Sequence, residues 1–76
     1  MIKIRKMLLD KGFDLKIDGS RNLFATHLKY TISVDKDYKG YKVELVEWLN
    51  SSIGRKTKLN TTKSKEIIKL IERLSI

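Results

Sequence analysis

The chain has 76 residues, of which 41% are hydrophobic and 34% charged, the composition of one small globular domain rather than of a disordered chain. It contains no cysteine and one histidine, so disulfides, thiolate metal sites and paired-histidine metal sites are excluded. No apolar run approaches the ~20 residues that cross a bilayer, so we expect a cytoplasmic protein that makes no membrane contact.

The net charge of +8 is unevenly distributed along the chain. Residues 1–50 carry ten basic and seven acidic side chains, whereas residues 51–76 carry seven basic and two acidic ones. Clustered positive charge favours a polyanionic or acidic partner. The alternative is that the lysines serve only solubility.

The N-terminal residues predict a helix over residues 3–11. Ile4, Met7 and Leu8 fall at helical spacing, and Gly12 suits the left-handed residue that follows a helix. The first four residues also alternate like a strand, which leaves the start of the helix open.

Two strands are predicted next, over residues 13–17 and 28–34. Apolar and polar side chains alternate in both segments, and Asp18-Gly19 between them is a turn dipeptide. Residues 35–40 have the polarity of a loop.

Residues 41–49 fit two patterns. Tyr41, Val43 and Leu45 alternate with polar residues and indicate a strand. Val43 and Val46 also belong to a helical spacing that a glycine at position 54 could end. We favour the strand, because it can pair with residues 28–34 across a short loop.

The last third predicts a turn over residues 50–54, a short extended segment over 55–59 and a helix over 62–74. Thr61 or Thr62 can cap that helix. The expected fold is therefore a single α+β domain, residues 1–76, in which a helix, a three-stranded antiparallel sheet and a second helix follow one another. Both helices should cover one face of the sheet.

The strongest candidate site is the basic segment over residues 54–65, which carries five basic residues and no acid and runs into a helix N-terminus. Backbone amides and the helix dipole at such an end favour a phosphate. The alternative is a solvated basic face. We expect the phosphate contacts to come from six cations: Arg55, Lys56, Lys58, Lys63, Lys65 and Lys69.

Three aromatic residues, Tyr38, Tyr41 and Trp48, are candidates for stacking or partner contacts. His27 is the only histidine, and its position near a strand start is more typical of a packing or surface residue than of a catalyst. Asp35 and Asp37 match a calcium loop at two positions only. We therefore expect no catalytic residue, no bound metal and no cofactor.

The segment Leu8-Leu9-Asp10-Lys11-Gly12-Phe13, the pair Gly19-Ser20 and the strand Ile32-Ser33-Val34 resemble the first part of HicA-type, double-stranded-RNA-binding-like domains. Ser64-Lys65 is similar to the serine–lysine start of the last helix in double-stranded-RNA-binding domains. The resemblance implies a helix, three strands and a helix, and RNA cleavage by a histidine after the Gly-Ser pair. Here that position is Arg21, so the activity is not implied.

The sequence is compatible with two functions. The first is a non-catalytic nucleic-acid-binding module, for RNA or DNA, that contacts phosphates through its basic C-terminal segment. The second is a small inhibitor or adaptor, of the kind that phages and other mobile elements encode, that grips an acidic surface of a host protein. The strand edge at residues 13–17 could also pair with a second copy of the chain.

Overall fold

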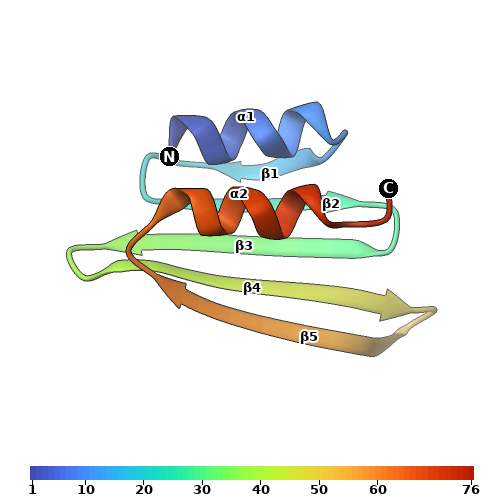
Figure 1. Ribbon diagram of the computed structural model, residues 1–76. Helices are drawn as coiled ribbons and strands as arrows, with labels where there is room; N and C mark the ends of the chain where they lie inside the picture. The colour runs from blue at the N-terminus through green and yellow to red at the C-terminus, as the bar shows by residue number, and fades with distance from the viewer.

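The computed structural model describes residues 1–76, which form two helices and five strands (Figure 1). They follow one another as α1 (Ile2–Asp10), β1 (Asp14–Asp18), β2 (Asn22–His27), β3 (Tyr30–Asp37), β4 (Gly40–Leu49), β5 (Ser52–Thr61) and α2 (Ser64–Glu72). Neither helix has the length and apolar character that crossing a membrane would require.

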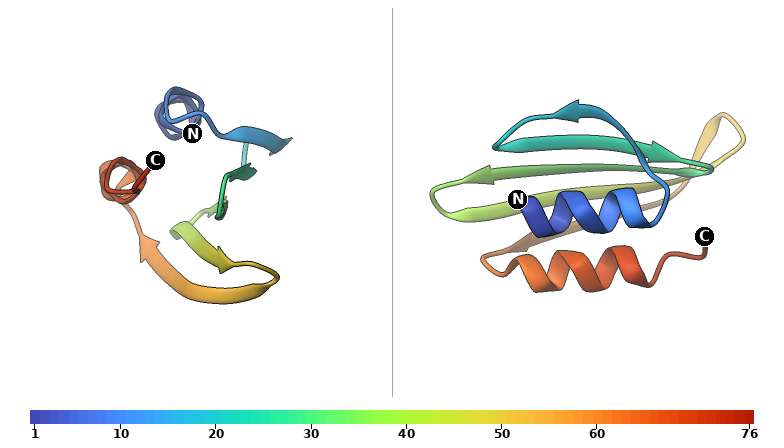
Figure 2. Two further views of the ribbon diagram at one scale, coloured as in Figure 1. Left: turned by 90° about the vertical axis from the view of Figure 1, so that its right-hand side faces the viewer. Right: turned by 90° about the horizontal axis from the view of Figure 1, so that it is seen from above.

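The five strands form one antiparallel sheet in the order β1-β2-β3-β4-β5, so β1 and β5 are its two edges. Both helices lie on the same face, and the sheet curves around them (Figure 2). The helices run in the same direction and begin at the same end of the molecule (Figure 1). The opposite face carries no helix, and we call it the open face.

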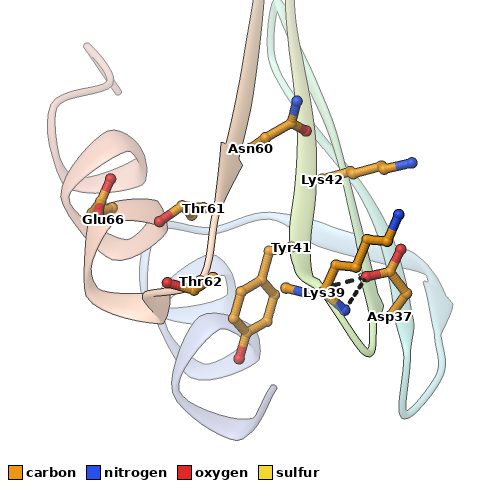
Figure 3. A pocket seen from close by; sticks show the side chains of 9 residues that line it. Asp37, Lys39, Tyr41, Lys42, Asn60, Thr61, Thr62 and Glu66 are labelled. Carbon is orange, nitrogen blue, oxygen red and sulfur yellow. Dashed lines mark hydrogen bonds between the residues drawn. The ribbon is translucent and has the colours of Figure 1, made fainter.

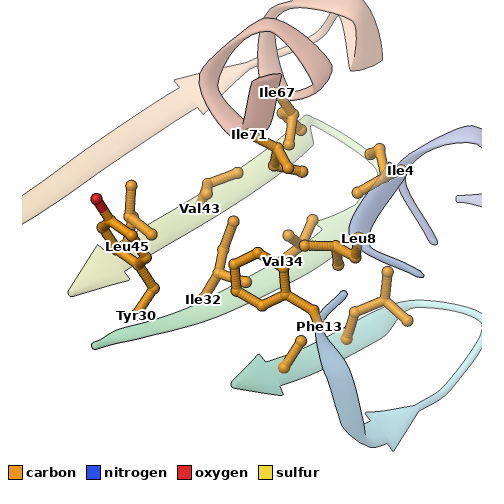
Figure 4. Close-up of a cluster of buried hydrophobic side chains, with 12 residues drawn as sticks. Ile4, Leu8, Phe13, Tyr30, Ile32, Val34, Val43, Leu45, Ile67 and Ile71 are labelled. Atoms are coloured by element: carbon orange, nitrogen blue, oxygen red, sulfur yellow. The ribbon is translucent and has the colours of Figure 1, made fainter. Parts of the chain in front are cut away.

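The core lies between the helices and the covered face of the sheet (Figure 4). Cross-strand register places side chains in rows there, for example Ala25 beside Ile32 and Ile32 beside Leu45. The helices close this layer with two fully buried residues each: Ile4 and Leu8 from α1, and Ile67 and Ile71 from α2.

Helix α1 ends as its sequence predicts. Gly12 adopts a positive φ of 92°, and the amide of Phe13 donates a 2.9 Å hydrogen bond to the carbonyl of Leu8. This bond turns the chain back under the helix and buries the Phe13 ring. The predicted helix over residues 3–11 is confirmed to within one residue at each end.

The predicted three-stranded sheet was wrong, because the sheet has five strands. One missed strand is β2, and the predicted strand over residues 28–34 begins in the turn that follows it. Leu28 continues the apolar alternation of Tyr30 and Ile32, yet it lies in that turn with a φ of 51°. Nothing in this turn provides the glycine or asparagine that such a conformation favours.

The other missed strand is β5 (Ser52–Thr61), which contains residues 52–54 of the predicted turn and all of the short extended segment over 55–59. Its residues are exposed or only half-buried on both faces, as expected for an edge strand, so it lacks the apolar alternation that reveals a strand. Residues 41–49 do form a strand, β4, as favoured over the helix.

Helix α2 begins two residues later than predicted, at Ser64. The hydroxyl of Thr61 accepts a 3.1 Å hydrogen bond from the amide of Lys63, so it closes the turn before the helix. Lys63 itself occupies the N-cap position, and no side chain caps the helix.

Candidate nucleic-acid interface

Five of the six predicted cations lie on β5 and α2, which adjoin each other at one edge of the molecule (Figure 2), and Lys63 lies in the connection between them. Strand residues alternate between faces, so Lys56 and Lys58 lie on the open face. Arg55 is opposite Glu47 in the strand register and lies on the helix side, without an ion pair between the two. Lys65 and Lys69 lie on the exposed side of α2. The structure thus spreads the predicted segment over two faces of one flank. We call its seven cations the basic flank: Arg55, Lys56, Lys58, Lys63, Lys65, Lys69 and Arg73.

The basic flank is almost free of ion pairs. The structure has four ion pairs, and three of them, Arg5–Asp18, Lys16–Asp14 and Lys29–Glu47, involve only residues of the first two thirds of the chain. On the flank, only Lys56 has a carboxylate partner, Glu44 at 3.4 Å. The other six cations are therefore available to an external anion.

Helix α2 starts in a way that favours an anion. Lys63 is the N-cap residue and Lys65 lies in the first turn, where positive charge opposes the helix dipole. Glu66 is the only acidic residue of that turn. A serine, threonine, asparagine or aspartate at the N-cap would stabilise the helix, so its sequence favours charge here over stability.

A groove of about 420 Å³ opens between the end of α2 and strands β4 and β5. Arg55 of β5 and Arg73 after α2 both line it, and neither has an ion-pair partner. Lys29 and Glu47, also in the wall, pair at 3.0 Å, and that hydrogen bond raises the pKa of Lys29 above its usual value. Two unpaired guanidinium groups in one groove suit a phosphate.

Arg73 was missed from the sequence, where it reads only as a residue on the solvent side of the last helix. Its role depends on the return of α2 across the sheet, which places Arg73 in the wall of the same groove as Arg55. A shallow hollow of about 270 Å³ on the open face is lined by Lys42 of β4 and Lys58 of β5, but Asp35 and Glu44 line it as well, so its charges balance.

The largest hollow, of about 530 Å³, lies where β5 leads into α2 (Figure 3). Its charged side chains balance, since Asp37 and Glu66 face Lys39 and Lys42. The Asp37 carboxylate already accepts hydrogen bonds from the backbone amides of Lys39, at 2.8 Å, and Gly40, at 3.1 Å. This hollow therefore favours an anion less than the arginine groove does.

The three candidate aromatic residues do not form one platform. Tyr38 is fully exposed in the turn between β3 and β4, and Tyr41 packs against the core from the helix side. Trp48 lies on the open face, where its indole Nε1 donates a 3.1 Å hydrogen bond to the hydroxyl of Thr31.

His27 packs its ring against Phe13, with the ring centroids 5.5 Å apart. It is therefore a packing residue at the end of α1. No three histidine, aspartate or glutamate side chains gather as a metal site would require.

Comparison of the chain with family models, with curated proteins and with solved structures found no match.

Proposed function

We propose that the chain is a non-catalytic nucleic-acid-binding module that contacts phosphates through its basic flank. The observation that carries the proposal is that seven cations gather along one flank and only one of them has an ion-pair partner. Clustered positive charge that carboxylates do not neutralise favours a polyanion, whose phosphates release counterions when cations replace them.

The mode of contact follows from the residue types. Lysines on β5 and α2 present point charges, and Arg55 and Arg73 present planar groups that can hold one phosphate in two hydrogen bonds. The flank has no array of asparagine or glutamine side chains for reading base edges. Binding should therefore depend weakly on base sequence and strongly on salt.

The test is a salt titration of a labelled oligonucleotide, followed by fluorescence anisotropy. Replacing Lys58, Lys65 and Lys69 by glutamine removes three flank charges, so the slope of log affinity against log salt should fall by about 2 to 3. The matched control replaces Lys3, Lys6 and Arg21, three exposed and unpaired cations that lie on α1 and in the turn between β1 and β2. Equal losses in both triple variants would show that net charge alone, and not the flank, holds the nucleic acid.

The second candidate function is an inhibitor or adaptor that binds an acidic surface of a host protein. The observation that favours it is that β1 is an edge strand, so its outer backbone groups are free to pair with a partner, as predicted for residues 13–17. Pairing there with a partner strand or a second copy is hindered by a bulge at Lys16 and by the charged side chain of Asp14. Recovery of one stoichiometric protein from nuclease-treated lysate would favour this function over the first.

A further inference from the structure

Two turns bring large apolar side chains together at one end of the molecule. Leu28, in the turn between β2 and β3, is 80% exposed, and Leu49 and Ile53, beside the turn between β4 and β5, are 67% and 54% exposed. Both turns lie at the same end of the sheet (Figure 1). The amide of Trp48 donates a 2.7 Å hydrogen bond to the carbonyl of Lys29, which joins the two turns. We call Leu28, Trp48, Leu49 and Ile53 the apolar end.

The backbone conformation of Leu28 indicates that the turn between β2 and β3 has a function besides joining the two strands. Its φ of 51° is strained for a leucine, and its exposed side chain gains no burial in return. Asparagine or glycine would suit the turn better. A residue held in an unfavourable conformation without a packing reason points to a functional one.

The charges around the apolar end indicate a long polyanion as the partner. Arg55, which has no ion-pair partner, lines a hollow of about 280 Å³ together with Trp48, Leu49 and the Lys29–Glu47 ion pair. From there the basic flank continues along β5, whose ten residues span about 33 Å. It includes Lys56, which pairs with Glu44, and Lys58, which is unpaired, and it reaches Lys63 beyond the far end of the strand. A flat anionic membrane touching the apolar end would leave those distant cations several Debye lengths away. A nucleic acid lying along β5 would contact both regions.

The exposed side chains also favour a duplex over a single strand. Single strands are bound by exposed aromatic rings on which bases stack, but here the only aromatic residue, Trp48, is the least exposed of the four and is hydrogen-bonded to Thr31. The most exposed side chains are aliphatic, like those that enter between base pairs and kink a duplex.

We propose that the apolar end is a wedge that enters between stacked base pairs of duplex DNA while the basic flank holds the phosphates. This inference rests on the proposed nucleic-acid-binding function and assigns its ligand class. Leu28 and Leu49 are the wedge side chains. Insertion should unstack one base step and bend the duplex, most readily at a flexible pyrimidine–purine step.

The experiment uses a DNA duplex with a central TA step that carries 2-aminopurine and with a fluorophore pair at its ends. The variant combines Leu28→Asn, which relieves the strained backbone, with Leu49→Gln. The matched control combines Ile2→Gln and Leu9→Gln, which replace two exposed apolar side chains on α1. Anisotropy reports binding, 2-aminopurine emission reports unstacking, and energy transfer between the ends reports bending.

The wild-type chain and the control should raise 2-aminopurine emission at least about twofold and shorten the end-to-end distance. The wedge variant should lose both signals while keeping the salt slope of binding. Binding by the wild-type chain without either signal, or tighter binding to single-stranded DNA or duplex RNA, would overturn the wedge and leave the basic flank intact. Absence of any salt-dependent binding would overturn the proposed function and the wedge with it.

Discussion

At the scale of one residue, Lys63 adds a positive charge to the basic flank and leaves helix α2 without a stabilising N-cap side chain. It occupies the N-cap position of α2, and Glu66 three residues later is already placed to complete a capping box. We predict that Lys63→Ser raises the free energy of unfolding by about 0.5–2 kcal/mol, because the new hydroxyl can accept a hydrogen bond from a free amide of the first turn. The same substitution should weaken nucleic-acid binding, since it removes a flank cation.

Chemical denaturation measures the first effect and anisotropy the second. The control is Lys69→Ser, which removes the same charge from inside the helix, where serine cannot cap. If Lys63→Ser and Lys69→Ser changed stability alike, the N-cap argument would be wrong.

The Arg5–Asp18 pair ties α1 to the end of β1, and it makes stability depend on pH. Arg5 Nε lies 2.9 Å from both carboxylate oxygens of Asp18. The hydrogen bond from Arg5 holds the pKa of Asp18 below its usual value, so the pair stabilises the fold above pH ~4 and this stabilisation is lost as pH falls through the depressed pKa.

We therefore predict that Asp18→Asn lowers stability at neutral pH and that its difference from the wild-type chain shrinks on acidification. Urea denaturation between neutral and strongly acidic pH measures the difference. Arg5→Gln should cause a similar loss at neutral pH, and the double variant should add little to it. A difference that stayed constant down to the lowest pH would contradict the role given to this pair.

At the scale of the elements, the sequence predicts what is buried better than what is exposed. Helix α1, strand β4 and the buried stripe of α2 follow from apolar spacing, because their positions against the core require it. The turn at Leu28 and the edge strand β5 cannot be predicted from apolar spacing, because their side chains are mostly exposed. The same holds for the candidate site. Its cations can be predicted from the sequence, but that Arg55 and Arg73 line one groove follows only from the tertiary fold.

Hydrogen exchange of the β5 amides can distinguish the five-stranded sheet from the three-stranded sheet that the sequence predicts. Its inner amides bond to β4 and its outer ones face solvent, so protection should alternate along residues 52–61. Amides of the central strand β3 should be protected throughout. Uniformly fast exchange over β5 would mean that it is a loop, and uniformly slow exchange would mean that another strand covers its edge.

At the scale of the whole molecule, the basic flank and the apolar end adjoin each other at the edge of the sheet that β5 forms. The helix layer and the sheet enclose a small core (Figures 1 and 2). The basic flank follows β5 and α2 along one edge, and the apolar end lies at the turns where β5 begins. A polyanion lying along β5 would meet the unpaired Arg55 and Lys58 on the strand, Lys63 beyond it, and aliphatic side chains at the other end. At the opposite edge, the charged side chains of β1 are held in two ion pairs, Lys16–Asp14 and Arg5–Asp18.

The most direct test of the central claim is a nuclear magnetic resonance titration of the isotopically labelled chain with a short DNA duplex at low salt. We predict that amide shifts move along residues 55–58, over residues 63–69, around Arg73 and at the apolar end, and that they return to their free values as salt is added. The amides of β1 should move little. Shift changes centred on β1, or none at all at low salt, would contradict binding through the basic flank.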